Sequence, residues 1–169
     1  MKKWIRAARV FAVAGSILPA VLGSVFAYHE TGRLNILLMA LTVAGVAIVH
    51  VGANFINDYF DHITGADEKN LEGIFPFSGG SRYIQNGILP ARQILLAAIL
   101  CFSMGIAIAV GLFIIVGYGV LILAAVALLS CIFYVSPRIS LTNLGLGEVA
   151  VGFNLGFLDV MGSYYVQTS

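Results

Sequence analysis

The sequence predicts an all-α fold, a polytopic transmembrane helical bundle of about five spans, and three observations lead to it. Hydrophobic residues make up 60% of the 169 residues and charged residues only 10%, whereas about a quarter of an ordinary soluble domain is charged. The apolar residues form long runs, and about 20 such residues cross a hydrocarbon core of roughly 30 Å as a helix. These runs are continuous, unlike the alternating strands of a membrane barrel.

Five apolar runs give the predicted helices, near residues 10–28, 34–56, 92–115, 117–135 and 146–166. The first contains Pro19 and Gly23, which membrane helices tolerate because neighbouring groups satisfy the freed backbone. The second continues into a polar stretch, and Thr64, Gly65 and Ala66 are expected to end it. The third and fourth are joined by a short uncharged link, which predicts a hairpin. In the fifth, Gly152 and Gly156 have the small-xxx-small spacing of closely packed membrane helices.

The basic residues are distributed unevenly along the chain. With the N-terminus in the cytoplasm, only Arg33 lies outside, as the positive-inside rule requires. The inner set is Lys2, Lys3, Arg6, Arg9, Lys69, Arg82, Arg92 and Arg138. We therefore predict a multi-pass protein of the cell inner (cytoplasmic) membrane, with residues 1–169 forming a single transmembrane domain and residues 57–91 a cytoplasmic functional loop. The net charge of +1 gives no indication of nucleic-acid binding, and we expect the lipid bilayer as a partner but no nucleic acid.

An acidic motif, NDYFDHITGAD, runs from Asn57 to Asp67 at the end of the second apolar run. An acid near the bilayer centre costs about 2.5–3.5 kcal/mol, so such a cluster is a functional candidate. Each helical residue turns by about 100°, which places four oxygen-bearing side chains on one face. They are Asn54, Asn57, Asp58 and Asp61. Oxygen ligands of this kind favour a hard cation over a soft metal.

Mg²⁺ is the cation that this pattern favours. Mg²⁺ usually takes one or two protein carboxylates and completes its coordination with water and substrate phosphate, so the motif predicts a metal-bridged phosphate ligand. The alternative is that the acids only cap and solvate a helix end, but carboxylates at a helix C-terminus are unfavourable with the macrodipole. The acids lack the alternation of an EF-hand loop, and the sequence contains no P-loop or nucleophile elbow.

Three segments of the chain carry a resemblance to a known family. NDYFDHITGAD resembles the first Asp-rich motif of the UbiA superfamily of intramembrane aromatic prenyltransferases, whose first helix commonly carries a Pro and a Gly. GGSRYIQNG from Gly79 to Gly87 and GLGEVAVGFNLGFLDVMGSYYVQT from Gly145 to Thr168 are similar to its menaquinone branch, the 1,4-dihydroxy-2-naphthoate polyprenyltransferases. The resemblance covers nearly the whole chain and implies a partial UbiA-type fold.

The resemblance implies Mg²⁺-dependent transfer of a polyprenyl group from polyprenyl diphosphate to an aromatic acceptor. The favoured acceptor is 1,4-dihydroxy-2-naphthoate, in menaquinone biosynthesis, and 4-hydroxybenzoate or another aromatic compound is the alternative. Two other classes stay open. A small cation-binding membrane transporter would use its acids as an ion path, and a non-catalytic interaction subunit would complete a site held by another chain.

The resemblance also implies roles for individual residues. Asp58 and Asp61 would be catalytic and, with Asn54, would hold Mg²⁺, with Asp67 as an outer ligand. Asn57 would orient its neighbours and the substrate.

Three further charged residues are substrate-binding candidates. Lys69 and Arg82 are the cations nearest the motif, and Arg82 is favoured for the diphosphate because Arg suits bidentate phosphate contacts; an anionic-lipid contact is the alternative. Glu148 would orient the aromatic hydroxyl or simply favour a helix N-terminus.

Two polar residues lie deeper in the predicted spans. Asp159 is a functional candidate by default, but the family segment usually has an uncharged residue there. Asp159 is therefore protonated, paired with a neighbour such as Asn154, or a departure from the family pattern. His50 is expected to be a packed, hydrogen-bonded helix residue rather than a metal ligand.

The family implies features that the sequence lacks. Its members have about nine helices and a second Asp-rich loop that holds another Mg²⁺. We therefore expect an N-terminal portion of such an enzyme, with little or no transfer activity alone, whose site a C-terminal half or a second chain would complete.

Overall fold

The computed structural model describes residues 2–65, 80–136, 141 and 144–169, and this part of the chain forms helices and turns without strands. The first four elements are α1 (Lys2–Ala7), a 3₁₀ turn (Val10–Val13), α2 (Ala14–Thr31) and α3 (Ile36–Thr64). The remaining elements are α5 (Ala91–Val116), α6 (Gly119–Val135), α7 (Gly147–Val151), a π-helix (Gly152–Leu158) and α8 (Asp159–Thr168). The predicted all-α class is confirmed.

Four of the described helical segments are long and apolar enough to cross a membrane, rather than the predicted five. They are Val10–Thr31, Ile36–Thr64, Ala91–Val116 and Gly147–Thr168. The predicted span at residues 117–135 forms α6, which has only 17 residues. At 1.5 Å per residue this helix rises about 26 Å, somewhat less than the hydrocarbon thickness of roughly 30 Å.

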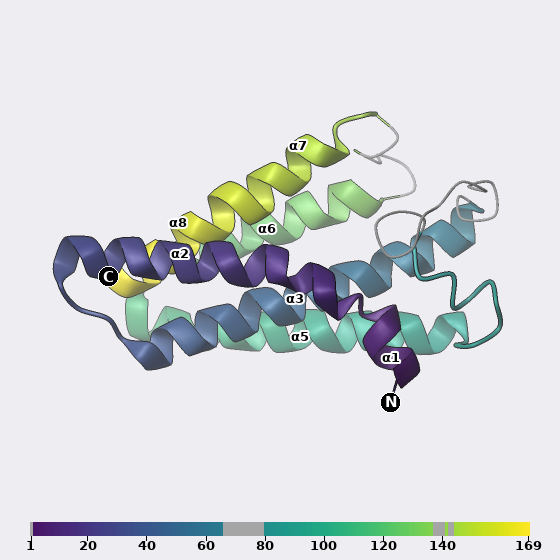
Figure 1. Cartoon of the computed structure of the whole chain (residues 1–169), viewed down its shortest axis with the longest axis horizontal. Helices are drawn as coiled ribbons and strands as arrows, with labels where there is room; N and C mark the ends of the chain where they lie inside the picture. The colour runs from purple at the N-terminus through teal and green to yellow at the C-terminus, as the bar shows by residue number, and fades with distance from the viewer. Residues whose placement is uncertain (1, 66–79, 137–140, 142–143) are drawn as a thin grey trace.

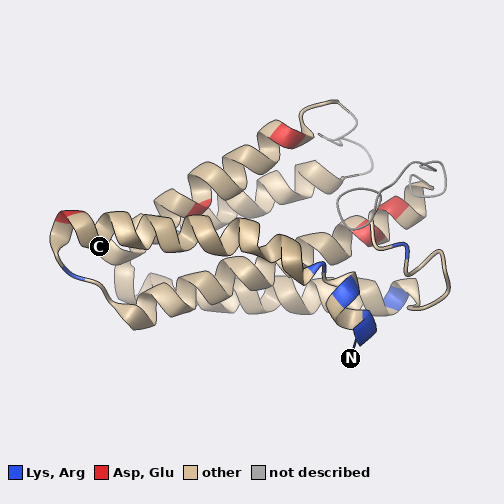
Figure 2. Cartoon of the chain, in the orientation of Figure 1, with Lys and Arg blue, Asp and Glu red and all other residues tan. Residues whose placement is uncertain are grey.

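The helices lie lengthwise in an elongated bundle (Figure 1), in which α3 packs most extensively against α5, and α2 against α8. The short α1 lies near the C-terminal end of α3. Figure 2 shows basic residues gathered at this end of the bundle, and a further one at the opposite end, where α2 connects to α3. The predicted charge asymmetry is therefore present in space, while the orientation in the membrane stays a prediction.

Local signals fix both ends of α3. The Asn35 side chain accepts a hydrogen bond from the Leu38 backbone N–H at 3.1 Å and so caps the N-terminus. At the other end Gly65 adopts the left-handed conformation, with φ of 69°, and its N–H bonds the carbonyls of Asp61 and His62. The predicted end at Gly65 is confirmed, and the acidic motif begins on the last turns of a helix continuous with the span.

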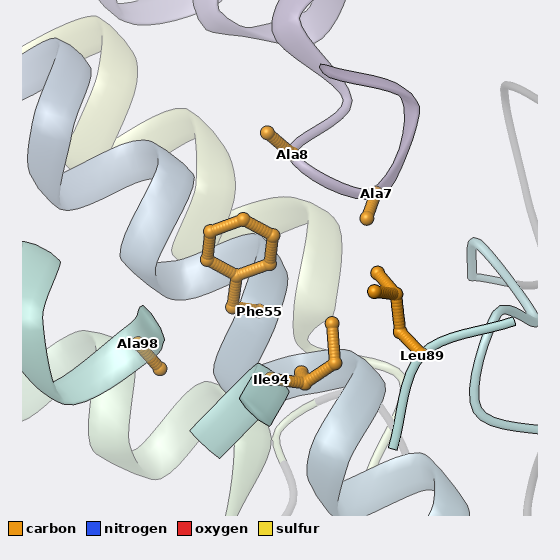
Figure 3. Packing of buried hydrophobic residues seen from close by; sticks show 6 residues of the cluster. All are labelled: Ala7, Ala8, Phe55, Leu89, Ile94 and Ala98. Atoms are coloured by element: carbon orange, nitrogen blue, oxygen red, sulfur yellow. The ribbon is translucent and has the colours of Figure 1, made fainter. Parts of the chain in front are cut away.

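A buried cluster holds the N-terminal segment against α3 and α5 (Figure 3). It consists of Ala7, Ala8, Phe55, Leu89, Ile94 and Ala98. Trp4 packs edge-on against Phe55, with 5.9 Å between ring centroids. A second cluster is formed by Leu38, Leu112, Val116, Val120 and Val166. The two clusters lie at different heights along α3, so the core is divided between the two ends of the bundle.

Close helix packing occurs at glycines other than the predicted pair. A Cβ on Gly152 or Gly156 would have no described atom within 4 Å. A Cβ on Gly23 would instead lie 2.2 Å from the Val160 carbonyl oxygen. The glycine that permits the contact between α2 and α8 is therefore Gly23.

Replacing Gly23 tests this contact. Alanine normally favours a helix over glycine, but the Cβ of Gly23→Ala would overlap backbone of α8, so we expect a loss of about 1–3 kcal/mol. The matched control is Gly156→Ala, which adds the same methyl group in open space. Thermal unfolding in detergent should show a lower Tm for Gly23→Ala only, and equal Tm values would contradict the assignment.

Candidate functional site

Helix α3 and the N-terminal segment meet at a cluster of amides and charges. The Arg9 guanidinium forms an ion pair with the Asp58 carboxylate, and the same nitrogen donates to Asn57 Oδ1 at 3.3 Å. One turn earlier on α3, Asn54 Nδ2 donates to the Ala8 carbonyl at 2.9 Å. These contacts tie the segment that precedes the first span to the acidic motif.

Asp58 is the most buried member of the cluster, with 2% of its surface exposed. Its Oδ1 also accepts from the Ser81 backbone N–H at 3.2 Å, and its Oδ2 accepts from the Ser81 hydroxyl. A buried carboxylate is tolerated only when paired and hydrogen-bonded. Asp58 satisfies this condition by joining three separate segments of the chain.

An unusual backbone turn brings Arg9 to this position. Arg9 has φ of 48° and ψ of 47°, the left-handed region, where residues other than glycine are uncommon. Such a conformation costs on the order of 1–3 kcal/mol and persists only when the surroundings hold it. The turn interrupts the helix between Ala7 and Val10, and the contacts with Asp58 and Asn57 compensate for it.

An apolar cavity of about 520 Å³ extends from the cluster into the bundle. Arg9, Asn54 and Asn57 line it at the cluster, together with Tyr134 of α6. Along α3 the lining continues back to Thr42, 15 residues before Asn57, which corresponds to about 22 Å of helix. The deep lining is mostly apolar and includes Leu112, Val120 and Val166. The cavity therefore suits a long apolar molecule with a polar head.

The structure assembles part of the predicted site. It brings Asn54, Asn57 and Asp58 together, and Asp61 follows on the last turn of α3, half-buried. Arg82 is half-buried with φ of 54°, Glu148 is exposed in the first turn of α7, and neither lines the cavity. The other two candidates, Asp67 and Lys69, lie outside the described residues.

Three residues of the site were missed from the sequence. Arg9 was interpreted as a topology charge only, although it is the last basic residue before the first span. Ser81 lies in the GGSRYIQNG segment. Its hydrogen bonds to Asp58 join residues 23 positions apart, and no pattern in the neighbouring sequence indicates them. Tyr134 falls at the end of the predicted span 117–135, and only the packing of α6 shows that it lines the cavity.

The donor atoms of the site fit Mg²⁺ in kind. Carboxylate and amide oxygens are suitable ligands, and one or two carboxylates suffice. The described residues contain no group of three or more His, Cys, Asp and Glu side chains arranged around one point. Asp58 Oδ1 accepts two hydrogen bonds and Oδ2 accepts one, and a carboxylate has about four acceptor positions, so one position on Oδ2 is left for a metal ion.

The site thus combines an apolar cavity with a cluster of amides and charges at one end. The chain belongs to the UbiA prenyltransferase family, whose family model matches residues 16–169. The resemblance seen in the three sequence segments is thereby confirmed.

Curated relatives carry related names. The chain is 32% identical over 178 residues to a 1,4-dihydroxy-2-naphthoate octaprenyltransferase of Haemophilus influenzae, covering 99% of the chain and 55% of the relative. It is 27% identical over 166 residues to UbiA prenyltransferase domain-containing protein 1 of Danio rerio, covering 97% and 47%. A 2-carboxy-1,4-naphthoquinone phytyltransferase of Synechocystis is 26% identical over 168 residues, with 99% and 52% covered. The chain spans about half the length of these relatives.

The ion pair can be tested by a double-mutant cycle. Arg9→Ala and Asp58→Ala each leave one charge without its partner, so each should cost about 3–5 kcal/mol, and the double variant should cost less than their sum. Trp4 is the only tryptophan and packs on Phe55 beside the pair, so its fluorescence should shift to the red in either single variant.

The control for this cycle is Arg6→Ala, which removes an exposed charge from the same N-terminal segment. The ion pair would be refuted as an anchor if Arg9→Ala matched Arg6→Ala in both Tm and Trp4 emission.

Proposed function

We propose that the protein acts in the Mg²⁺-dependent transfer of a polyprenyl group from polyprenyl diphosphate to 1,4-dihydroxy-2-naphthoate, a step of menaquinone biosynthesis. In this reaction the allylic C–O bond breaks, diphosphate leaves with the electron pair, a C–C bond forms to the ring, and carbon dioxide is lost. The observation that carries the proposal is the polar cluster at one end of a long apolar cavity, in a chain of the UbiA prenyltransferase family.

The cavity suits the donor substrate. An isoprenoid chain is apolar and would bury its surface against residues such as Leu112, Val120 and Val166. Its diphosphate needs cationic and polar partners, which Arg9, Asn54 and Asn57 offer at the other end. The substrate would thus lie along α3, with its head group at the end that carries the acidic motif.

Arg9 is the cation that we propose to contact the diphosphate. Its Nε is buried and has no hydrogen-bond partner among the described residues, while one terminal nitrogen holds Asp58 and Asn57. The planar guanidinium presents several donors to phosphate oxygens at once. Arg82 and Lys69 stay proposed contacts because they are the cations nearest the acidic motif in the sequence.

We propose that Asp61 and the amide oxygens of Asn54 and Asn57 hold Mg²⁺, with Asp67 as an outer ligand. When bound, the ion offsets the negative charge that develops on the departing diphosphate. Asp58 would position Arg9 through Oδ1 and serve as a further Mg²⁺ ligand through Oδ2. Glu148 stays a proposed contact for the acceptor hydroxyl.

The proposed metal and diphosphate site can be tested by binding. Asp61→Asn removes a carboxylate ligand, so the Kd of farnesyl diphosphate in the presence of Mg²⁺ should rise at least about tenfold, and EDTA should have the same effect on the unmodified protein. Glu30→Gln, an acid at the opposite end of the bundle, is the control. A Kd that changes neither when Mg²⁺ is removed nor in the Asp61→Asn variant would refute the assignment.

The acceptor can be tested by transfer in proteoliposomes. With labelled farnesyl diphosphate and Mg²⁺, we expect the labelled product to form from 1,4-dihydroxy-2-naphthoate in preference to 4-hydroxybenzoate. Product from hydroxybenzoate only would overturn the acceptor, and ion flux without any product would favour the transporter alternative.

A further inference from the structure

A second polar cluster lies deeper in the cavity, away from the acidic motif. The Ser16 hydroxyl of α2 lies 2.7 Å from His50 Nδ1 of α3, and Asp159 of α8 lines the cavity beside them. All three residues line the cavity, and Ser16 is almost fully buried. The expectation that His50 is a hydrogen-bonded helix residue is thus confirmed. We call Ser16, His50 and Asp159 the deep polar cluster.

The deep polar cluster is separated by a fixed length of helix from the head-group end of the cavity, which is lined by Arg9, Asn54 and Asn57. His50 precedes Asn57 by seven residues on α3, which corresponds to about 10 Å. Neighbouring lining residues at this level, such as Val46, Val49 and Leu155, are apolar. A molecule held at the head-group end would therefore meet one further polar level before the apolar remainder of the cavity.

The π-helix positions Asp159 at this level. Its last bond runs from the Asp159 backbone N–H to the Asn154 carbonyl, five residues earlier. Residues five apart lie about 140° apart on an α-helix, but this wider turn brings them closer to one face, and both Asn154 and Asp159 line the cavity. The Asn154 amide donates to Ser130 Oγ at 2.6 Å. π-Helical turns occur frequently at functional sites.

One oxygen of Asp159 needs a donor. Asp159 Oδ2 is buried and has no hydrogen-bond partner among the described residues. An ionisable group inside a bilayer is costly, and a buried acceptor without a partner adds to that cost. A purely structural link between α2, α3 and α8 would be served by an uncharged residue. The carboxyl group is better explained by a ligand that supplies the missing donor.

We propose that the deep polar cluster binds a hydroxyl group of the aromatic acceptor, with Asp159 accepting the hydrogen bond. This inference rests on the proposed function and extends it. A prenyl chain has no donor and would leave Asp159 unsatisfied, whereas a phenolic hydroxyl supplies one. The same carboxyl group disfavours the carboxylate of a naphthoate, so that this group would point away from Asp159. The deep polar cluster would thus set the orientation of the ring.

The test uses two probes that differ by one hydroxyl group, 4-hydroxy-2-naphthoate and 2-naphthoate. Their Kd values are measured by equilibrium dialysis with the full chain in nanodiscs. The unmodified protein should bind the hydroxylated probe about tenfold more tightly, the size of a hydrogen bond to a charged group. Asp159→Ala should abolish this preference and leave 2-naphthoate binding unchanged.

Further variants separate binding from folding. Asp159→Asn keeps an acceptor oxygen and should retain part of the preference, and Ser16→Ala should reduce it by removing a hydroxyl group from the deep polar cluster. Glu30→Gln should change neither Kd. Circular dichroism and Tm identify any variant that fails to fold. If Asp159→Ala does not fold, the hydroxyl preference of Asp159→Asn tests the proposal instead. Equal binding of both probes by the unmodified protein, or equal weakening of both by Asp159→Ala, would overturn the proposal.

Binding of farnesyl diphosphate in the same nanodiscs distinguishes the two proposals. Mg²⁺-dependent binding without a hydroxyl preference would refute the acceptor subsite alone. A hydroxyl preference without Mg²⁺-dependent binding would refute the proposed function and support the deep polar cluster as a site for hydroxylated aromatic compounds.

Discussion

The ion pair between Arg9 and Asp58 is the interaction on which the rest of the site depends. Asp58 is buried, and its partners lie 49 and 23 positions away along the chain. One carboxylate therefore determines where the N-terminal segment lies and where the stretch after residue 80 returns to the bundle. The apolar cluster around Phe55 packs beneath the same junction, so burial of apolar surface and pairing of charge reinforce each other there.

The same pair limits how a cation can bind. A divalent ion and a guanidinium group are both attracted to the Asp58 oxygens, and they repel each other at short range. If the head group of a substrate brings phosphate oxygens to this place, Arg9 gains a new partner and Asp58 can be satisfied by the metal ion instead. Head-group binding would then be coupled to the position of the N-terminal segment, because Arg9, Ala8 and Trp4 all contact α3.

The sequence predicts the features that depend on local pattern. The run into the acidic motif and its end at Gly65 follow from helical periodicity and a left-handed cap, and three ordered segments suffice to identify the family. Features that depend on long-range packing were missed. Arg9 turns inward through a strained backbone, α6 ends after 17 residues, and Gly23 rather than Gly156 meets a neighbouring helix. The π-helix before Asp159 has no signal in hydrophobic periodicity. The roles of Asp61, Arg82 and Glu148 stay predictions, as do those of Asp67 and Lys69.

Two polar levels in one apolar cavity have different consequences for the two substrates. An apolar pocket gains affinity with each methylene group that it buries but makes no directional contact, whereas a hydrogen bond to a hydroxyl depends on the presence and the position of that group, because an analogue without it leaves buried polar groups unpaired. If Asp159 holds the acceptor hydroxyl, the acceptor is recognised by the position of a polar group, and the prenyl chain by buried apolar area alone. The Asp159 carboxyl group is costly to bury at the level of His50, and it would then be the group that makes the site specific for its acceptor.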